Sequence, residues 1–255
     1  MKLGVSYNVY DGEELLRFAA KSVRSEVDFI CAVYQPVSYV GNPADPGLPA
    51  LLDQLKSEGL IDDVITFKND LSLVSYENEV NARNTGRLAS VAQGCTHHIT
   101  IDVDEFFHAH EVRYAKKVME DGDFDCSIVG METYYKRPEY MVIPSQNLLI
   151  PFIQKAEHPH LSHELKWPYK TDRTRCSSVY DKCRVFTTDE IKMHHMSHVR
   201  RDIDKKIRNS ANGPFYDRKF EVDFDKYEVG QRVRLLPDFR NRKTVLVENI
   251  FGIKI

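Results

Sequence analysis

Three carboxylates at the end of an apolar segment carry the strongest chemical signal in the sequence. The run at positions 98–103 has the apolar character of a strand, and Asp102, Asp104 and Glu105 fall within four residues at its end. Because side chains of a strand alternate between two faces, Asp102 and Asp104 should point to one side, where their charges repel. A divalent cation relieves that repulsion, and Mg²⁺ and Mn²⁺ prefer one or two carboxylate oxygens together with phosphate oxygens of a substrate. We therefore expect Asp102 and Asp104 to ligate Mn²⁺ or Mg²⁺; the alternative is that the carboxylates only cap or solvate a strand end.

A histidine cluster far along the chain offers a further metal ligand. His194, His195 and His198 lie within five residues, and a neutral imidazole is a suitable ligand for Mn²⁺. Only some of them can face one site, and we expect His195 to be the third metal ligand. The alternative is that these histidines have a structural role inside the protein.

Other histidines surround the carboxylate segment, which raises the idea of a hydrolytic site with two metals. They are His97, His98, His108 and His110. Adjacent strand residues point to opposite faces, and the last two lie beyond the strand, so the four cannot converge. We expect them at the surface or supporting other groups.

The elements that must position these side chains read as an α/β fold. Apolar runs of strand length alternate with segments of helical period through the first 130 residues, which predicts a mostly parallel sheet flanked by helices. The expected strands are 2–7, 29–34, 64–67, 98–103 and 124–131, and the expected helices start near 11 and cover 49–58 and 77–94. The last helix should turn Val80, Leu88 and Val91 inward. In such a sheet, ligands bind outside the carboxyl ends of the strands, which is where the carboxylates lie.

The second half of the sequence has a looser pattern. Residues 133–185 are rich in Tyr, Pro, His and Arg and read as irregular structure with antiparallel strands, followed by a helix at 199–209 and short strands at 233–236 and 244–247. We expect an α/β half at 1–132 and an irregular α+β region at 133–255, packed together as one compact domain.

Composition excludes several classes of protein. The 255 residues are 42% hydrophobic and 29% charged, which rules out a disordered or low-complexity chain, and the net charge of −3 gives no reason for indiscriminate binding to nucleic acid. Residues 199–255 carry a net charge of +5, however, against −8 for residues 1–198. Five cysteines without a C-x-x-C pair indicate reduced thiols, and no run of about 18 apolar residues occurs. We expect a soluble, cytoplasmic protein.

Two segments resemble a known enzyme family. Residues 81–89 (Asn-Ala-Arg-Asn-Thr-Gly-Arg-Leu-Ala) and 94–106, which end in Asp-Val-Asp-Glu-Phe, are similar to the D-x-D region of family-2-like glycosyltransferases of the GT-A fold. The strand at 4–8 with its acidic helix start, and the strand ending at Gln35, resemble the nucleotide-holding parts of that family. The segment 195–200 is similar to a later His-aromatic-x-x-Val-Arg segment, although the aromatic positions differ here. The resemblance spans roughly residues 1–135.

The resemblance implies a metal-dependent hexosyl- or pentosyltransferase that moves a sugar from a nucleotide-sugar donor to an acceptor hydroxyl. A cation that bridges the diphosphate would stabilise the charge of the leaving group. By the family pattern, Asp104 would ligate the metal and Asp102 would hold the ribose or help to ligate. The other donor-binding residues implied are Ser6, Asn8, Tyr34 and Arg83.

An inverting transferase also needs a base for the acceptor hydroxyl. Glu132 follows the expected fifth strand and should lie on the cleft side of the sheet, and Asp172 in a basic loop is the second choice. Glu132 has the alternative of pairing with Lys136 or Arg137, and a retaining enzyme would need no such base.

The acceptor and the rival functions stay open. The segments 166–175 and 239–243 interleave aromatic and cationic residues, which suits an anionic acceptor such as a phosphate-bearing glycan, a lipid-linked sugar or a modified nucleic acid; a solvated basic loop is the alternative. A nucleotidyltransferase would usually carry a Gly-rich loop after the first strand, which residues 6–12 lack. A non-catalytic nucleic-acid-binding protein is the third class. The sequence does not determine the oligomeric state.

Overall fold

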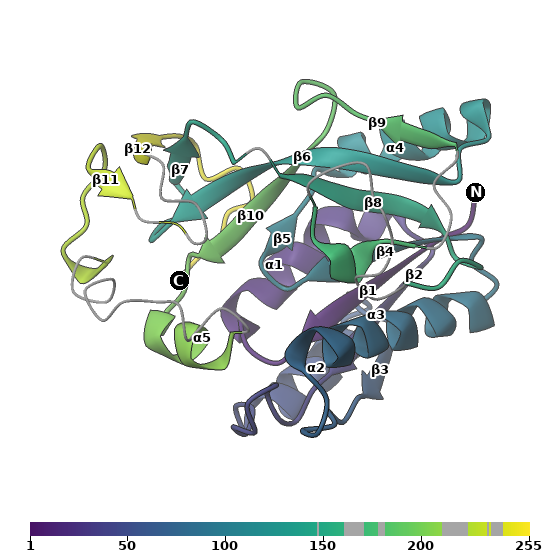
Figure 1. Cartoon of the computed structure of the whole chain (residues 1–255), viewed down its shortest axis with the longest axis horizontal. Helices are drawn as coiled ribbons and strands as arrows, with labels where there is room; N and C mark the ends of the chain where they lie inside the picture. Colours follow the sequence, from purple (N-terminus) through teal and green to yellow (C-terminus); the bar gives the residue numbers. More distant parts are fainter. Residues whose placement is uncertain (147, 161–170, 178–181, 211–223, 234, 236–241) are drawn as a thin grey trace.

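The computed structural model describes residues 1–146, 148–160, 171–177, 182–210, 224–233, 235 and 242–255 (Figure 1). Its strands are β1 (Leu3–Val9), β2 (Phe29–Tyr34), β3 (Asp63–Thr66), β4 (His97–Asp102), β5 (Glu105–Phe106), β6 (Cys126–Tyr135), β7 (Tyr140–Ile143), β8 (Leu149–Lys155), β9 (Cys183–Val185), β10 (Lys192–His198), β11 (Arg232–Val233) and β12 (Arg242–Leu246). Its helices are α1 (Glu13–Val23), α2 (Leu48–Ser57), α3 (Ser75–Ala92), α4 (Ala109–Gly122) and α5 (Ile203–Asn209), with short 3-10 turns η1 (Arg24–Glu26) and η2 (Arg173–Arg175).

The described strands form one mixed sheet in which the N-terminal strands are parallel. The order is β11-β12-β7-β6-β8-β4-β1-β2-β3. Within it, β4, β1, β2 and β3 run parallel to one another. Beyond β4 the path is antiparallel through β8, β6, β7 and β12, while β10 lies parallel to β6 and antiparallel to β5. The expected α/β class is therefore confirmed, with its mixed strands in the second half of the chain.

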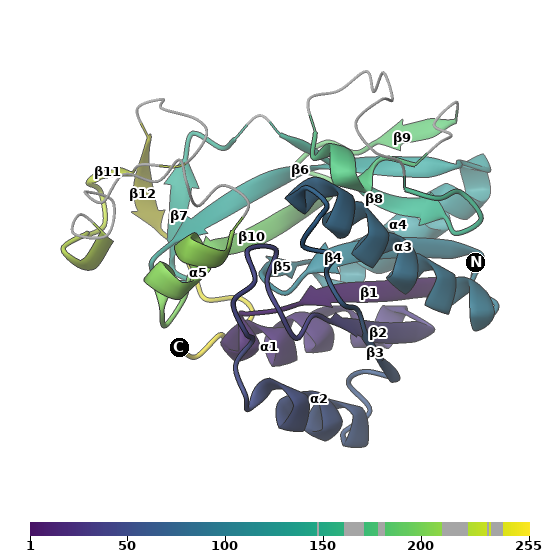
Figure 2. The same cartoon turned by 60° about the horizontal axis from the view of Figure 1, so that its bottom comes forward.

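Successive residues of strand β1 point to opposite faces of the sheet, and a different helix packs on each face. Tyr7 belongs to the face covered by α1, where its hydroxyl donates to the carbonyl of Ala19. Ser6 belongs to the opposite face, against α3, and a Cβ added at Gly86 would lie 2.3 Å from the Ser6 Cβ. A glycine at this helix position therefore lets α3 approach β1 closely. Figures 1 and 2 show α1 and α3 on opposite sides of the parallel strands.

The orientation of α3 and the existence of α4 differ from expectation. Val80 is buried as expected, but Leu88 and Val91 are 55% and 42% exposed, because most of the buried face of α3 consists of small and polar residues such as Ala82 and Ser90. The helix α4 was not expected at all. Its buried residues Val112, Ala115 and Met119 have helical spacing but are separated by charged residues.

The hydrophobic core has two main parts that matter for the site. The larger cluster joins side chains from Leu3 to Ile253, and a smaller one lies between α5, β7 and β11.

The boundary expected after Glu132 falls within β6 (Cys126–Tyr135). None of the helices in the described part of the chain combines the length and the apolar character needed to cross a membrane.

Candidate functional site

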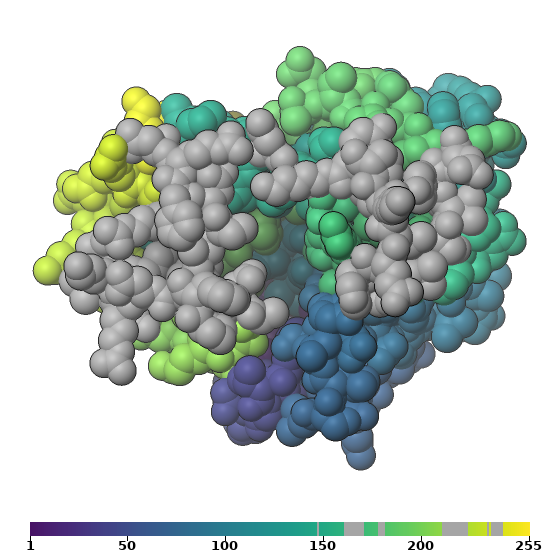
Figure 3. All heavy atoms as spheres, in the orientation of Figure 1, coloured from purple at the N-terminus to yellow at the C-terminus, as the bar shows by residue number. Residues whose placement is uncertain are grey.

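A cleft of about 250 Å³ lies at the carboxyl ends of the parallel strands. Asn8 near the end of β1, Gln35 directly after β2 and Asp102 at the end of β4 all line it. The lining residues are Asn8, Tyr10, Asp11, Gln35, Ser38, Tyr39, Glu79, Asp102, Val103, Asp104, His195, Arg200, Lys206, Asn209 and Ser210. Figure 3 shows a hollow on this face of the molecule, between blue atoms of the N-terminal half and green atoms near residue 200.

The strand order gives the cleft two chemically different ends. Because β1 lies between β2 and β4, Gln35 and the carboxylates that follow β4 are on opposite sides of Asn8. The β2 side offers Gln35, Ser38 and the Tyr39 ring, with the Glu79 carboxylate near that ring, whereas the β4 side gathers Asp104, His195, Arg200 and Lys206. The cleft can thus accept a neutral, flat, polar group at one end and an anion at the other.

Asp104 is the centre of the charged end. Its buried carboxylate accepts from Arg200 Nη2 at 2.6 Å and from Lys206 Nζ at 2.5 Å, both at Oδ2. Burial raises the pKa of Asp104, but Lys206 and Arg200 outweigh burial and hold that pKa well below its ordinary value. Asp104 is therefore ionised at neutral pH, and its second oxygen, Oδ1, faces the His195 ring.

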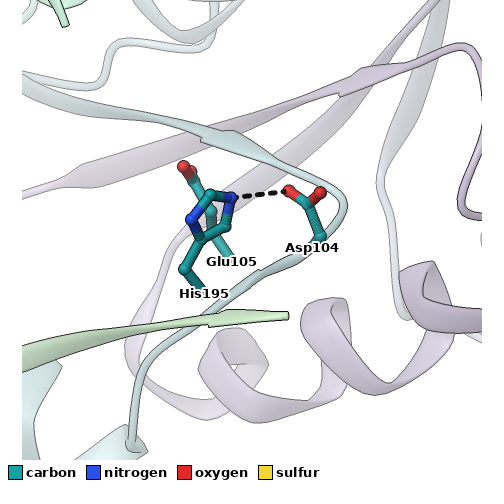
Figure 4. A group of neighbouring side chains, drawn as sticks. All are labelled: Asp104, Glu105 and His195. Atoms are coloured by element: carbon teal, nitrogen blue, oxygen red, sulfur yellow. Dashed lines mark ion pairs between the residues drawn. The ribbon is translucent and has the colours of Figure 1, made fainter. Parts of the chain in front are cut away.

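His195 reaches this carboxylate from β10. Its Nε2 lies 3.7 Å from Asp104 Oδ1, and Figure 4 shows the carboxylate and the ring facing each other. Its buried Nδ1 has no hydrogen-bond partner among the described residues. Burial lowers the pKa of His195 to about 4, more than the Asp104 charge raises it, so the ring is neutral near pH 7 and keeps a lone pair for a ligand.

A divalent cation fits this donor set at two atoms. Ligand atoms of Asp104, Glu105 and His195 lie within 4.8 Å of one another. Glu105, however, is held by both Arg175 amines at 2.6 and 2.7 Å, so its lone pairs are engaged. Asp104 Oδ1 and His195 Nε2 are the donors that face the cleft, and Mn²⁺ and Mg²⁺ commonly take few protein ligands and complete their shell with phosphate and water.

Asp102 belongs to a network of arginines and carboxylates beside the cleft. Arg175 Nη2 donates to its Oδ2 at 2.8 Å, Arg83 lies 3.3 Å from both oxygens, and Asn8 Nδ2 is 3.4 Å from Oδ1. Burial raises the pKa of Asp102, and the two arginines lower it further than burial raises it. The side chain remains 34% exposed, so it can still accept from a ligand hydroxyl.

Arg83 supports the network and does not line the cleft. Its guanidinium is fully buried and contacts Glu79, Thr100, Asp102, Asp172 and Thr174. The sequence suggested that Arg83 meets the donor. The structure places it behind Asp102, where its charge fixes the carboxylate.

Ser6 and Tyr34 also lie outside the cleft lining. Ser6 is fully buried under α3 and its hydroxyl lies 3.1 Å from His98 Nε2, because it precedes the end of β1 by three residues, whereas Asn8 on the same face reaches the cleft. Tyr34 packs against the hydrophobic core. Tyr39, five residues after the end of β2 at Tyr34, supplies an aromatic ring at this side of the cleft instead.

Glu132 does not face the cleft side, contrary to expectation. It is in register with His194, whereas Thr133 is in register with the cleft residue His195, and successive residues alternate between faces. Its carboxylate pairs with Lys192 at 3.1 Å. Glu132 is therefore separated from a nucleophile in the cleft by the sheet itself.

Asp172 lies next to the network but is committed to ion pairs. It accepts from Arg175 Nε at 3.0 Å, lies 3.5 Å from Arg83 and caps η2 by accepting from the Thr174 amide. Burial raises its pKa, yet Arg83 and Arg175 bring the pKa down to about 2. A carboxylate with so low a pKa is a weak proton acceptor, so the placement favours a role in holding the arginines.

Replacement of Asp172 by asparagine should therefore cost stability in a pH-dependent way. Because the folded-state pKa is lowered, the stabilisation is present above the unfolded pKa near 3.8 and is lost as pH falls toward about 2. We expect a loss of at most about 2 kcal/mol at pH 6 that shrinks below pH 4. Urea unfolding from pH 6 to pH 3 measures it, with exposed Asp53→Asn as the control; a loss that is constant over this range contradicts the assignment.

Sequence reasoning missed the cations from the second half of the chain and the neutral groups after β2. These residues are Ser38, Tyr39, Arg175, Arg200 and Lys206, and the Glu79 carboxylate on α3 was missed as well. The net positive charge of residues 199–255 was a signal for Arg200 and Lys206, but it did not indicate their partner. Residues 166–170 and 239–241 of the two expected aromatic and cationic strips lie outside the described residues.

Comparisons with known proteins give structural matches alone. No family model matches the chain, and no curated protein matches it. It is similar to a crystal structure of S. aureus TarS 1–349, at 13% identity and a TM-score of 0.48 over 82% of this chain and 64% of that one. The longer TarS structure matches at 12% identity and 0.48, and the chain covers 38% of it. TarS 1–349 in complex with UDP-GlcNAc matches at 13% and 0.42, over 73% of this chain and 58% of that one. The chain thus spans less than two thirds of these proteins.

Proposed function

We propose that the protein is a glycosyltransferase that binds a nucleotide-sugar donor in this cleft and moves the sugar to an acceptor hydroxyl. One observation carries the proposal: the cleft joins an end that holds Gln35, Ser38 and the Tyr39 ring to an end that holds Asp104, His195, Arg200 and Lys206. A nucleoside joined to a diphosphate has the same two-part character. The position at the carboxyl ends of parallel strands supports it.

The residues of the cleft divide the work between binding and charge stabilisation. Gln35 and Tyr39 would hold the nucleobase, and Asn8 and Asp102 would hold the ribose between the two ends; all four line the cleft. Arg200 and Lys206 oppose the negative charge that the diphosphate gains as the bond to the sugar breaks. Arg200 is buried and fixed at the cleft before the reaction, so its charge needs little reorganisation.

Asp104 and His195 would hold the divalent cation, Mn²⁺ or Mg²⁺, that the D-x-D resemblance implies. When bound, such an ion supplies Lewis-acid stabilisation of the leaving diphosphate. The chain's own contribution is to keep Asp104 ionised and His195 neutral, which the surrounding charges and burial accomplish.

The proposed acceptor is defined only by its chemical class. A hydroxyl of a phosphate-bearing glycan, a lipid-linked sugar or a modified nucleic acid suits the positive charge of residues 199–255. A sugar-1-phosphate nucleotidyltransferase is the rival function. It is not favoured, because the connection from β1 to α1 holds Gly12 as its single glycine and that glycine lies against Arg200.

Calorimetry with UDP, GDP, ADP and CDP, each with and without Mn²⁺, tests the proposal. We expect one of these nucleotides to bind, and to bind at least about tenfold more tightly with Mn²⁺. Labelled sugar donors of the matching nucleotide should then be hydrolysed slowly in the absence of an acceptor. Failure of all four nucleotides to bind would refute the donor site, and release of pyrophosphate from a nucleoside triphosphate and a sugar phosphate would favour the nucleotidyltransferase.

A further inference from the structure

Two cations share a single oxygen of Asp104, and they differ in how firmly they are held. Arg200 and Lys206 both donate to Oδ2, so one negative charge faces two positive ones. The Arg200 side chain is 2% exposed, whereas that of Lys206 is 22% exposed. Lys206 is therefore the more accessible of the two cations.

Arg200 is fixed by its surroundings. Its Nη1 lies 3.4 Å from the carbonyl oxygens of Met196 and Val199, and its guanidinium packs beside Gly12, where an added Cβ would lie 3.3 Å from Nη2. Moving this group would break several contacts in a buried place. Arg200 is therefore a permanent partner of Asp104.

The backbone of Lys206 is fixed, but its ammonium can reorient. Ile203 and Ile207 are buried in the smaller hydrophobic cluster, and these contacts hold α5 in place. Within the part of the chain that the structure describes, the ammonium of Lys206 contacts no carboxylate other than Asp104. Its four-carbon stem can reorient the ammonium without moving the helix.

We propose that Lys206 is a displaceable counter-ion of Asp104, which releases this carboxylate and pairs with the donor diphosphate when a divalent cation binds. The inference rests on the proposed function. A cation that approaches Asp104 alone meets the Lys206 charge at short range and is repelled. A diphosphate gives Lys206 another partner, so the cation and the diphosphate each strengthen the binding of the other, and the effect is reciprocal.

The coupling predicts a specific result for Lys206→Met. Without any phosphate ligand, this variant should bind Mn²⁺ roughly tenfold more tightly than the parent, because the competing charge is gone. The gain in Mn²⁺ affinity on adding a diphosphate should shrink from about tenfold or more in the parent to about twofold. Electron paramagnetic resonance of free Mn²⁺ measures both, with inorganic pyrophosphate and with UDP, GDP, ADP and CDP. Mn²⁺ pairs with these ligands in solution equally for every variant, so differences between variants report the protein.

Two further variants complete the design. Lys205→Met is the matched control, because Lys205 is the neighbouring α5 lysine, pairs with Glu13 at 3.3 Å and does not line the cleft; it should behave as the parent. Lys206→Arg keeps the charge and should keep most of the coupling. Circular dichroism and thermal melting verify the fold, and Lys206→Gln replaces the methionine variant should that one fail to fold.

The outcomes separate this inference from the proposed function. Parent protein that binds Mn²⁺ and a nucleotide cooperatively, with unchanged coupling in Lys206→Met, would overturn the role of Lys206 and leave the donor site intact. Equal effects of the Lys205 and Lys206 substitutions would also overturn it, since they would indicate a general charge effect. Parent protein that binds none of the nucleotides would refute both.

Discussion

Replacement of Asp104 by asparagine is expected to lower sugar transfer by about 10²- to 10³-fold and to remove its dependence on Mn²⁺. Asp104 Oδ1 lies 3.7 Å from His195 Nε2 at the cleft. The carboxylate is ionised because Lys206 and Arg200 hold its pKa well below the ordinary value. An amide has the same shape but no charge with which to retain a divalent ion. Rates of donor consumption over a range of Mn²⁺ concentrations measure the effect.

A loss of stability must be distinguished from this loss of chemistry. Removing the Asp104 charge leaves the buried Arg200 and the half-buried Lys206 without their partner, which itself destabilises the fold. The double variant Asp104→Asn with Lys206→Met relieves part of that imbalance and should regain stability without regaining Mn²⁺ dependence. Exposed Asp53→Asn on α2 is the control. Transfer by Asp104→Asn at the parental rate and with parental Mn²⁺ dependence would refute the metal role.

Replacement of Arg175 by methionine should have the largest effect on stability, a loss of about 3–5 kcal/mol. Arg175 is buried and reaches three carboxylates: Glu105 through both amines, Asp102 through Nη2 and Asp172 through Nε. Its loss would leave buried negative charges without a partner. Burial has already raised the pKa of Glu105 to about 7 despite the arginine, so further loss of positive charge favours protonation or unfolding.

Urea unfolding at pH 7 measures the Arg175 effect, and two variants sharpen it. Arg173→Met changes an exposed arginine in the same short turn and should alter the free energy of unfolding by no more than about 0.5 kcal/mol. Adding Glu105→Gln to Arg175→Met removes one of the stranded charges and should restore part of the loss. A cost below about 1 kcal/mol for Arg175→Met would show that the network is not held together in this way.

The local pattern of the sequence determined the elements and one end of the site. Apolar runs and helical periods located β1, β2, β4 and α2 to within two residues at each end, because strand and helix formation in these segments follows nearest-neighbour periodicity. The local pattern also placed Asp102 and Asp104 together at the end of a strand. It predicted the extent of α3 but not its buried face, because the side of the helix that packs closely on β1 uses Gly86 and small or polar residues.

Tertiary structure alone decided which charges meet. Arg200 and Lys206 lie 96 and 102 residues from Asp104 along the chain, and Arg175 lies 70 from Glu105. Such pairs depend on the path of β10, α5 and η2 around the sheet, and no local pattern contains that path. The packing of α3 on β1 likewise buries Ser6 and leaves Asn8, nearer the end of the strand, at the cleft, and the β6–β10 register turns Glu132 away from it. The sequence by itself determined that carboxylates end a strand; packing decided which cations surround them, because those contacts form only when distant segments are brought together.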